Sequence, residues 1–398
     1  MTTKKLFIEL INKKIIFLVI EFYKDNNFKV LDEINTTSKG LENGNIVDLE
    51  ECVSTIQDCL FKIEKRLDYT FDSVNLIINN QDAEIINLNN TKKLHGDQLT
   101  KEDISYIINS SQKQIIDNNP NKEIIHLFNT SFFLDGEEKR KLPLGLAGDF
   151  YTHQLTFFLI KKNNLKNLKI LFGKCNLTIQ RIIDSNFLFN MNVYNLNSPI
   201  NFFCINIEKE KSYLTLFYNG SFCFLENFNF GTNIIKKDVS KLCSLELEVI
   251  DKIISEIDFE KEFSEELLEK KYFNNKNFRK ISILHIKEIM LARLNELLDI
   301  IFIKNINIKN LKTNIESCFI FIEDHGIYIK LKKNLCDYLI KKEKTKKFLI
   351  KEMTQNDEYL RCNLAAKLIN GGWQNEVLPL IQPKKSLISK VFTSLFGE

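Results

Sequence analysis

The sequence predicts an α/β protein made of two similarly organised halves, with a small unit inserted into the first. Each half opens with a meander of apolar strands and continues into segments with helical periodicity. The second half begins near Pro199, where the opening pattern of the chain is repeated. This repetition favours a duplicated fold with two related lobes.

Strands dominate the start of the first half. They are expected at Leu6 to Ile11, Ile15 to Phe22, Phe28 to Ile34 and Val74 to Ile78, because these apolar runs are separated by polar turns. The first two form a predicted hairpin around Asn12-Lys13-Lys14. Asp48 is a predicted helix cap, because an apolar stripe at helical spacing runs from Leu49 to Leu67 behind it.

Residues 80–160 are expected to form the inserted unit. Thr100 and Asp103 have the spacing of a helix cap, and isoleucines follow at helical spacing. Strands are predicted at Glu123 to Phe128 and Gln154 to Ile160. The unit is therefore a small α+β subdomain.

The second half repeats the meander and then becomes mostly helical. Its strands are predicted at Asn201 to Ile207, Tyr213 to Tyr218, Ser221 to Asn227 and Cys318 to Ile322. Asn219-Gly220 is a hairpin signal between the second and third of these. Helical periodicity extends from Lys236 to about Ile303 and returns at Lys333 to Lys341.

The last fifteen residues predict a basic amphipathic helix. Its apolar stripe consists of Leu387, Ile388, Val391, Phe392, Leu395 and Phe396, and its lysines are Lys384, Lys385 and Lys390. A helix of this kind suits a membrane surface, with Gly371-Gly372 and Pro383 in a linker before it. The alternative is a flap that packs on its own domain.

Composition excludes several classes of protein. A formal net charge of +3, from 55 basic and 52 acidic residues, is too balanced for a nucleic-acid binder. Nine cysteines without C-x-x-C pairs indicate a reducing compartment rather than disulfides or zinc, and the five histidines show no metal spacing. No apolar segment is long enough to span a bilayer, so we expect a cytoplasmic body with peripheral membrane contact.

Several segments, taken in order, resemble the FtsA family of bacterial cell division proteins. They are Ser38 to Asp48, Glu123 to His126, Leu142 to Gly148, Gly231 with Asp238-Val239, Ala292 to Leu297, and the terminal helix. The resemblance implies an actin-like, ribonuclease H-like duplicated fold of two lobes, with an inserted small α+β subdomain and a C-terminal amphipathic helix.

The resemblance also implies a division of the chain. Residues 1–79 and 161–198 would form the first lobe, and residues 80–160 would form the inserted subdomain. Residues 199–235 and 313–370 would form the second lobe, and residues 236–312 would form a small lobe that binds FtsZ. A linker at 371–383 would lead to a membrane-targeting helix at 384–398.

The family binds ATP with magnesium, but the matching loops of this chain are degenerate. The first loop, with Asp-x-Gly-Thr in the family, reads Glu9-Leu10-Ile11-Asn12, and Ile11 blocks the backbone approach that glycine allows. The second loop runs from Asn206 to Ser212 without glycine, and the adenosine loop keeps only Gly326. Glu9 could still face magnesium, or it could simply belong to a core strand. We predict weak or absent ATP binding, no hydrolysis, no catalytic residue and no metal site.

The resemblance implies a partner for the small lobe, the acidic C-terminal peptide of the tubulin-like protein FtsZ. Arg279, Lys280 and Arg293 are the matching basic residues, although a solvated helix face would look the same. The function implied is to tether the FtsZ ring to the cytoplasmic face of the inner membrane at midcell. Self-association into filaments and recruitment of downstream division proteins are also expected, and no nucleic acid is. The alternative is an actin-like ATPase of the pilus-assembly or chaperone type.

Overall fold

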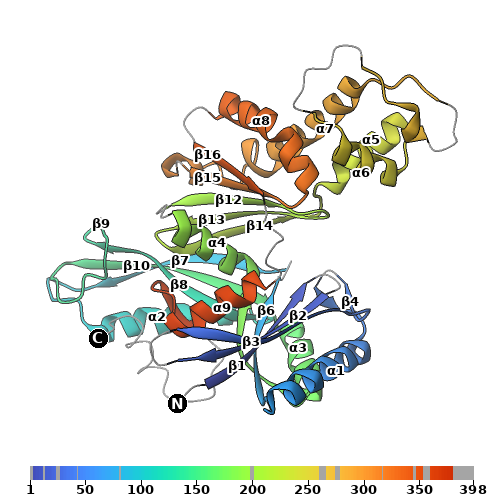
Figure 1. Cartoon of the computed structure of the whole chain (residues 1–398). Coiled ribbons are helices and arrows are strands. Elements are labelled where there is room, and N and C mark those ends of the chain that lie inside the picture. Colours follow the sequence, from blue (N-terminus) through green and yellow to red (C-terminus); the bar gives the residue numbers. More distant parts are fainter. Residues whose placement is uncertain are drawn as a thin grey trace. The chain divides into compact units, whose positions relative to one another are not determined.

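The computed structural model describes residues 3–11, 14–23, 27–42, 44–79, 82–197, 201–259, 266–273, 278–315, 317–343, 347–352 and 359–379 (Figure 1). The chain separates into two compact units. Unit 1 consists of Met1–Ile200, Tyr218–Cys223 and Asp357–Glu398, and unit 2 consists of Asn201–Phe217 and Phe224–Asn356.

A five-stranded sheet forms the centre of unit 1, in the order β11-β6-β1-β2-β3. Its strands are β1 (Thr3–Ile11), β2 (Lys14–Phe22), β3 (Phe28–Thr37), β6 (Ser73–Ile78) and β11 (Thr178–Asp184). β1 runs antiparallel to β2 and parallel to β6, and β11 is parallel to β6. The inner strands are almost continuously apolar because both of their faces are buried. The predicted meander and fourth strand are confirmed.

Two pairs of helices pack on this sheet. α1 (Leu49–Leu67) contacts α3 (Lys162–Lys174), and α4 (Ser185–Asn197) contacts α9 (Leu360–Gly371). The predicted cap of α1 is confirmed, since Asp48 Oδ1 accepts a hydrogen bond from the Glu51 N–H at 3.1 Å. A short hairpin of β4 (Leu41–Glu42) and β5 (Asn45–Ile46) precedes α1.

A second sheet of unit 1 contains the inserted subdomain. Its order is β17-β8-β10-β7, with β9 paired to β8. The strands are β7 (Glu84–Lys93), β8 (Lys122–Leu134), β9 (Glu137–Lys139), β10 (Phe150–Lys161) and β17 (Glu376–Pro379). Its helix α2 (Lys101–Asn118) has the predicted capping box, in which the Asp103 carboxylate accepts the Thr100 N–H at 2.8 Å. Ile104, Ile107, Ile108 and Ile115 of α2 pack with residues of the sheet in one apolar core.

A third sheet, most of whose residues belong to unit 2, repeats the first sheet of unit 1 strand for strand. Its order is β14-β13-β12-β15-β16, with β12 (Phe202–Ile207), β13 (Ser212–Tyr218), β14 (Ser221–Phe228), β15 (Ser317–Ile322) and β16 (Lys347–Glu352). The first strand is again central, antiparallel to the second and parallel to the fourth. Asn219 and Gly220 both have positive φ, 48° and 76°, as the predicted hairpin turn requires. The predicted duplication is confirmed.

The helices of unit 2 are α5 (Asn233–Cys243), α6 (Leu247–Glu256), α7 (Ile283–Leu298) and α8 (His325–Lys342), with short turns η1 (Lys270–Phe273), η2 (Asp299–Ile303) and η3 (Leu311–Asn314). α5 contacts both α6 and α7, and α8 contacts β15 and β16. Within the described ranges, no helix combines the length and apolar character needed to cross a membrane.

Two parts of the chain differ from the expected division. α9, inside the segment 313–370 assigned to the second lobe, contacts β1, β2 and β6 and so belongs to unit 1. Within the expected linker 371–383, Glu376–Pro379 forms β17, which pairs with β8. Both differences depend on contacts with residues far away in the sequence, which local patterns do not show.

Candidate functional site

The first-loop residue Glu9 forms an ion pair inside the chain. Glu9 lies near the carboxyl end of β1, and its side chain is only 1% exposed. Arg361, in the first turn of α9, places Nη1 3.2 Å from Glu9 Oε1. The contact of α9 with β1 and β2 fixes the arginine there. The charge of Glu9 is therefore balanced by Arg361.

A second buried carboxylate, Asp184, ends β11 at the same end of the sheet. Its Oδ1 caps α4 by accepting the N–H groups of Asn186 and Phe187 at 2.9 and 3.0 Å. Burial raises the pKa of Asp184 to about 7, although these two bonds and the nearby Arg361 favour the charged form. β11 and β1 flank β6, so the strands that hold Asp184 and Glu9 run about 10 Å apart.

In unit 2, the second loop is a tight turn between β12 and β13. The Glu208 N–H donates to the Lys211 carbonyl at 2.8 Å, which closes the turn. The Lys209 N–H donates to Glu323 Oε2, also at 2.8 Å. Two backbone donors of this loop are thus used within unit 2, one of them by a carboxylate.

The start of α5 packs closely on the same turn. The Thr232 N–H donates to the Glu208 carbonyl at 2.9 Å, and the Asn233 N–H donates to the Lys209 carbonyl at the same distance. A Cβ atom at Gly231 would overlap the Glu208 carbonyl oxygen, so only glycine fits this approach.

The other predicted cleft residues have structural contacts. Ser212 is fully buried and donates its hydroxyl to the Phe230 carbonyl at 2.8 Å. Asn206 is buried and accepts a hydrogen bond from Cys204 at 3.3 Å. Gly326, in the first turn of α8, leaves room for the side chain of Ile254. Asn12 lies outside the described residues.

The predicted partner residues fall into two environments. Arg293, on α7, pairs with Asp238 of α5 and places Nη1 2.7 Å from Glu296 Oε2. Arg279 and Lys280 are exposed, and Arg279 Nη2 donates to the Ser244 carbonyl at 2.8 Å. The structure thus gives Arg293 two carboxylate partners and leaves the Arg279 segment at the surface.

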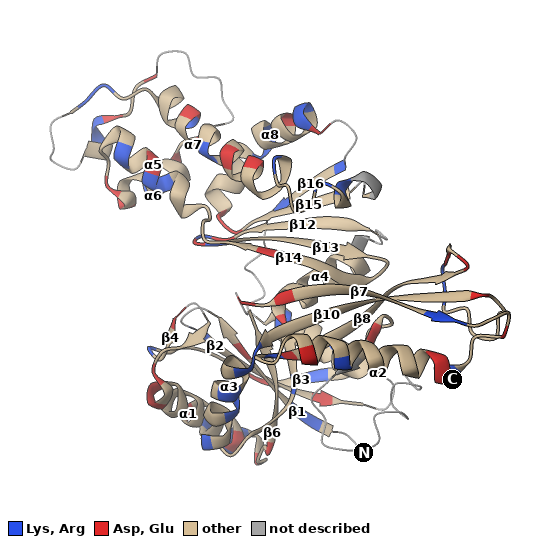
Figure 2. Cartoon of the chain, turned by 180° about the vertical axis from the view of Figure 1, so that it is seen from behind, with Lys and Arg blue, Asp and Glu red and all other residues tan. Residues whose placement is uncertain are grey.

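Exposed apolar residues lie close in sequence to Arg279 and to the α5–α6 turn that it binds. Leu242 is 67% exposed, Leu247 46% and Phe278 42%. Together with Arg279 and Lys280 they form what we call the basic–apolar patch. Figure 2 shows both lysines and acidic residues along α5 and α6. The exposed Glu246 and Glu248 lie at the start of α6 in the same region, so its charge is mixed.

The predicted membrane residues lie outside the described residues. They are Lys384, Lys385, Leu387, Ile388, Lys390, Val391, Phe392, Leu395 and Phe396.

A buried charge cluster, absent from the sequence predictions, joins β17 to β8 and β11. His126 Nδ1 lies 2.6 Å from Glu376 Oε1, and Arg181 pairs with the other carboxylate oxygen. His126 Nε2 accepts the Asp184 N–H at 3.1 Å, so Nδ1 carries the proton and donates to Glu376. Burial lowers the pKa of His126, which keeps the ring neutral. Burial alone would raise the pKa of Glu376, but Arg181 and His126 outweigh it and hold that pKa low.

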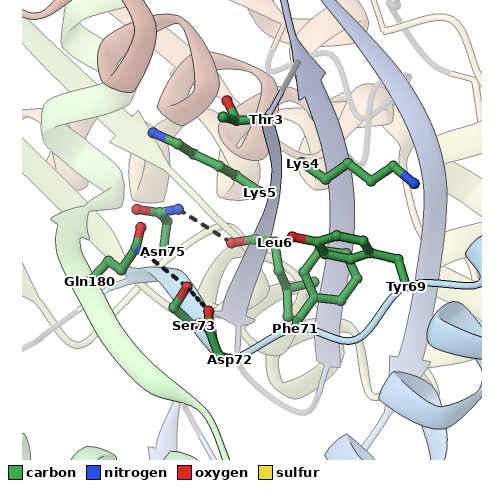
Figure 3. A pocket seen from close by; sticks show the side chains of 10 residues that line it. All are labelled: Thr3, Lys4, Lys5, Leu6, Tyr69, Phe71, Asp72, Ser73, Asn75 and Gln180. Carbon is green, nitrogen blue, oxygen red and sulfur yellow. Dashed lines mark hydrogen bonds between the residues drawn. The ribbon is translucent and has the colours of Figure 1, made fainter. Parts of the chain in front are cut away.

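A cavity of about 520 Å³ opens at the amino ends of β1 and β6 (Figure 3). Glu9 and Asp184 lie near the carboxyl ends of β1 and β11. Lys4 and Lys5 leave β1 in opposite directions, and Gln180 donates to the Ser73 hydroxyl at 2.9 Å. Burial lowers the pKa of Lys5, and the charge of Arg181 adds to this shift. The lining includes Asp72, so the cavity has mixed charge and no clear preference for an anion.

Metal ligands do not gather in the described part of the chain. No group of three or more His, Cys, Asp or Glu side chains there has an arrangement that could hold a metal ion.

The inserted subdomain carries the clearest similarity to known proteins. A family model described as "SHS2 domain inserted in FTSA" matches residues 80–152, from the start of β7 into β10. Cell division protein FtsA of Buchnera aphidicola subsp. Acyrthosiphon pisum is 26% identical over 235 residues, which are 58% of this chain and 56% of that protein. Its counterpart in Buchnera aphidicola subsp. Schizaphis graminum is 24% identical over 301 residues, 74% of this chain and 71% of that protein. This chain is therefore similar to FtsA proteins over much of its length, and residues 80–152 match the subdomain that is inserted in FtsA.

The fold of this chain is the predicted actin-like one. A solved PilM-PilN type IV pilus biogenesis complex superimposes with a TM-score of 0.52 at 9% identity, over 93% of this chain and 97% of that chain. At this identity the likeness concerns the fold alone. The match to the first Buchnera FtsA spans little more than half of that relative's length.

The residues present do not fit the magnesium and ATP that the FtsA family implies. Glu9, at the position of the metal-linked carboxylate, is already paired with Arg361. In the second loop, the Lys209 amide is bound by Glu323 rather than left for a phosphate. Ser212 and Asn206 direct their polar atoms to neighbouring protein groups.

Arg361, Asp184 and Glu376 were missing from the sequence predictions. Arg361 lies in the first turn of a largely apolar helix, whose other charged residue is Lys367. Asp184 follows an apolar run and precedes a helix, which is the pattern of a helix cap. Glu376 gave no local signal.

Proposed function

We propose that this chain is a cell division protein that tethers the FtsZ ring to the cytoplasmic face of the inner membrane and scaffolds divisome assembly. It would act without turning over ATP. The observation that carries the proposal is the family match of residues 80–152, supported by relatives named as cell division proteins.

The membrane arm of the proposal is the terminal segment Lys384 to Glu398. Fully burying a large apolar side chain contributes about 1.5–3 kcal/mol, but interfacial insertion is partial and ordering a tail costs about 1–2 kcal/mol per residue. Its three lysines add about 1 kcal/mol each near anionic lipid. One tail therefore binds reversibly, and a filament with many tails binds firmly.

The partner arm is the basic–apolar patch of unit 2. A guanidinium has five donors, and the bond to Ser244 uses one of those of Arg279, so the rest can pair with carboxylates. Leu242, Leu247 and Phe278 would cover the apolar side chains of the FtsZ C-terminal peptide. Arg293 would contribute indirectly, because its ion pair with Asp238 holds α7 against α5.

Self-association and recruitment complete the proposal. Filaments at midcell would multiply the weak membrane contacts, and the inserted subdomain would offer a surface to downstream division proteins. The near balance of basic and acidic residues supports no nucleic-acid partner.

Vesicle sedimentation tests the membrane arm. The full chain is expected to sediment with anionic vesicles, and deletion of 384–398 is expected to abolish this. Phe392→Glu places a charge on the apolar stripe and should cause the same loss. Thr393→Glu, which adds the same charge on the polar face, is the matched control and should retain most binding. Equal binding by the deleted chain would contradict the tether.

Titration with Mg-ATP tests the alternative, an actin-like ATPase of the pilus-assembly or chaperone type. The internal partners of Glu9 and of the Lys209 amide argue against it. Weak or undetectable binding is expected, and micromolar affinity would favour the ATPase.

A further inference from the structure

Charged side chains of this chain lie at the end of β1 and at the turn after β12, where the FtsA family binds a metal and a phosphate. We infer that the Arg361 guanidinium is the permanent counter-cation of Glu9, in the place of a divalent metal, and that the Glu323 carboxylate takes the place of a phosphate on the Lys209 amide. The inference rests on the proposed function, in which the chain works without nucleotide, and explains how each unit would keep its loop folded.

The position of Glu9 requires a cation. A carboxylate that is 1% exposed loses its hydration and stays ionised only beside a positive charge or several donors. Arg181 is already paired with Glu376, whereas Arg361 reaches Glu9 Oε1 at 3.2 Å. The guanidinium therefore neutralises the charge of Glu9, as a bound metal would.

α9 holds Arg361 in place. The residues that follow it, Cys362, Leu364, Ala365, Ala366 and Leu368, are buried. Because α9 contacts β1, β2 and β6, its first turn has little freedom to move away from Glu9. The arginine side chain is 25% exposed, so it lies at the edge of the core beside the carboxylate. A metal would have to displace a charge that the fold itself supplies.

Arg361 also acts on the second carboxylate at this end of the sheet. Its charge is the smallest of the influences that oppose the rise in the pKa of Asp184. Small hard cations prefer sites with two or more carboxylate or carbonyl oxygens. Without the guanidinium, Glu9 and Asp184 would offer the start of such a site.

The β12–β13 turn shows the complementary substitution within unit 2. Backbone N–H groups of a turn can bind a phosphate, and here one of them donates to Glu323 Oε2 at 2.8 Å. Glu323 directly follows β15, the neighbour of β12, so sheet topology brings it to the turn. An internal anion thus occupies the donor that a nucleotide would need.

Metal binding by the full chain tests the role of Arg361. The wild type is expected to show no binding of millimolar Mn²⁺ and no change in Tm. Arg361→Ala is expected to lower Tm by several degrees, and Mn²⁺ is expected to bind this variant and to restore most of the lost Tm. Arg361→Lys keeps the charge and should not bind Mn²⁺, and adding Glu9→Gln to Arg361→Ala should remove the metal effect.

Arg66→Ala is the matched control. Arg66 forms a two-point ion pair with Asp32, and their side chains are 51% and 13% exposed, so its removal also frees a carboxylate but one with more access to solvent than Glu9. This variant should gain no Mn²⁺ response. If Arg361→Ala fails to fold, Arg361→Met retains most of the side-chain volume and serves in its place.

Two results would overturn the inference. One is binding of Mn²⁺ by the wild type as tightly as by the arginine variants. The other is a stability loss in Arg361→Ala and Arg361→Met that Mn²⁺ does not reverse, since the pair would then be an ordinary structural salt bridge. Neither result bears on vesicle sedimentation, which tests the proposed function separately.

Discussion

Arg181 of β11 and Glu376 of β17 form a buried ion pair, with side chains 10% and 3% exposed. The pair fastens the last described strand of the chain to the central sheet of unit 1, and His126 fastens the same carboxylate to β8. β17 is only four residues long, so backbone pairing alone would hold it weakly. The segment that leads toward the predicted membrane helix is therefore held by side-chain charge.

Glu376→Ala is expected to destabilise unit 1 by about 3–5 kcal/mol, because it leaves the Arg181 guanidinium buried without a partner. Glu376→Gln should cost less, since its amide oxygen can still accept from His126. Urea unfolding measures both. A loss below about 1 kcal/mol for the alanine variant would show that the pair does not hold β17.

Asp184 is expected to make stability depend on pH. Its pKa is about 7 in the folded protein and about 3.9 when unfolded. The folded state therefore binds more protons between these values, and the free energy of unfolding falls as pH rises from about 4 to about 7. Asp184→Asn should remove this slope and stabilise the protein above pH 7 by about 2–4 kcal/mol.

The test is to measure the free energy of unfolding of the wild type and of Asp184→Asn across that pH range. The difference between the two free energies at each pH is the result. His126 contributes with the opposite sign, since its lowered pKa means that stability rises with pH below about 6.5, but this term is common to both proteins. Asp72→Asn, at an exposed position, is the control. Parallel curves for wild type and Asp184→Asn would refute the assignment.

Gly231→Ala is expected to destabilise unit 2 by about 1–3 kcal/mol, because the added methyl group overlaps the Glu208 carbonyl and must push the β12–β13 turn away from α5. Gly173→Ala, near the end of α3, meets no atom and should stabilise the protein by about 0.4–1 kcal/mol. Thermal unfolding compares the two. Equal effects would mean that the turn does not depend on the close approach.

The sequence was sufficient wherever local pattern decides structure. The apolar runs of β1 and β2 need both faces buried, and the caps Asp48 and Thr100 act on N–H groups three residues away. The same topology in two sheets could be suspected because each half opens with the same meander. β7 was missed because it is an edge strand of mostly polar residues, without a continuous apolar run.

Of the two buried pairs, only Glu9 was predicted as a site residue. Glu9 was found by its place in the first loop, but Arg361 lies 352 residues further along the chain. His126 and Glu376 are separated by 250 residues. Ion pairs of this kind have no periodicity, and only the packing of α9 and β17 on distant strands brings their members together. The exposure of Arg279 and the pairing of Arg293 likewise depend on how α5, α6 and α7 pack.

Arg279→Glu is expected to weaken binding of the acidic FtsZ C-terminal peptide at least about tenfold, or about 1.4 kcal/mol. The change replaces an exposed donor group with a repelling carboxylate in the middle of the basic–apolar patch. It should also reduce the salt dependence of the affinity, because fewer charges are paired. Fluorescence anisotropy with a labelled peptide measures both quantities. Arg66→Glu makes the same charge change on unit 1 and should leave the affinity within about twofold, or about 0.4 kcal/mol. Equal losses for the two variants would mean that net charge, rather than this patch, attracts the peptide.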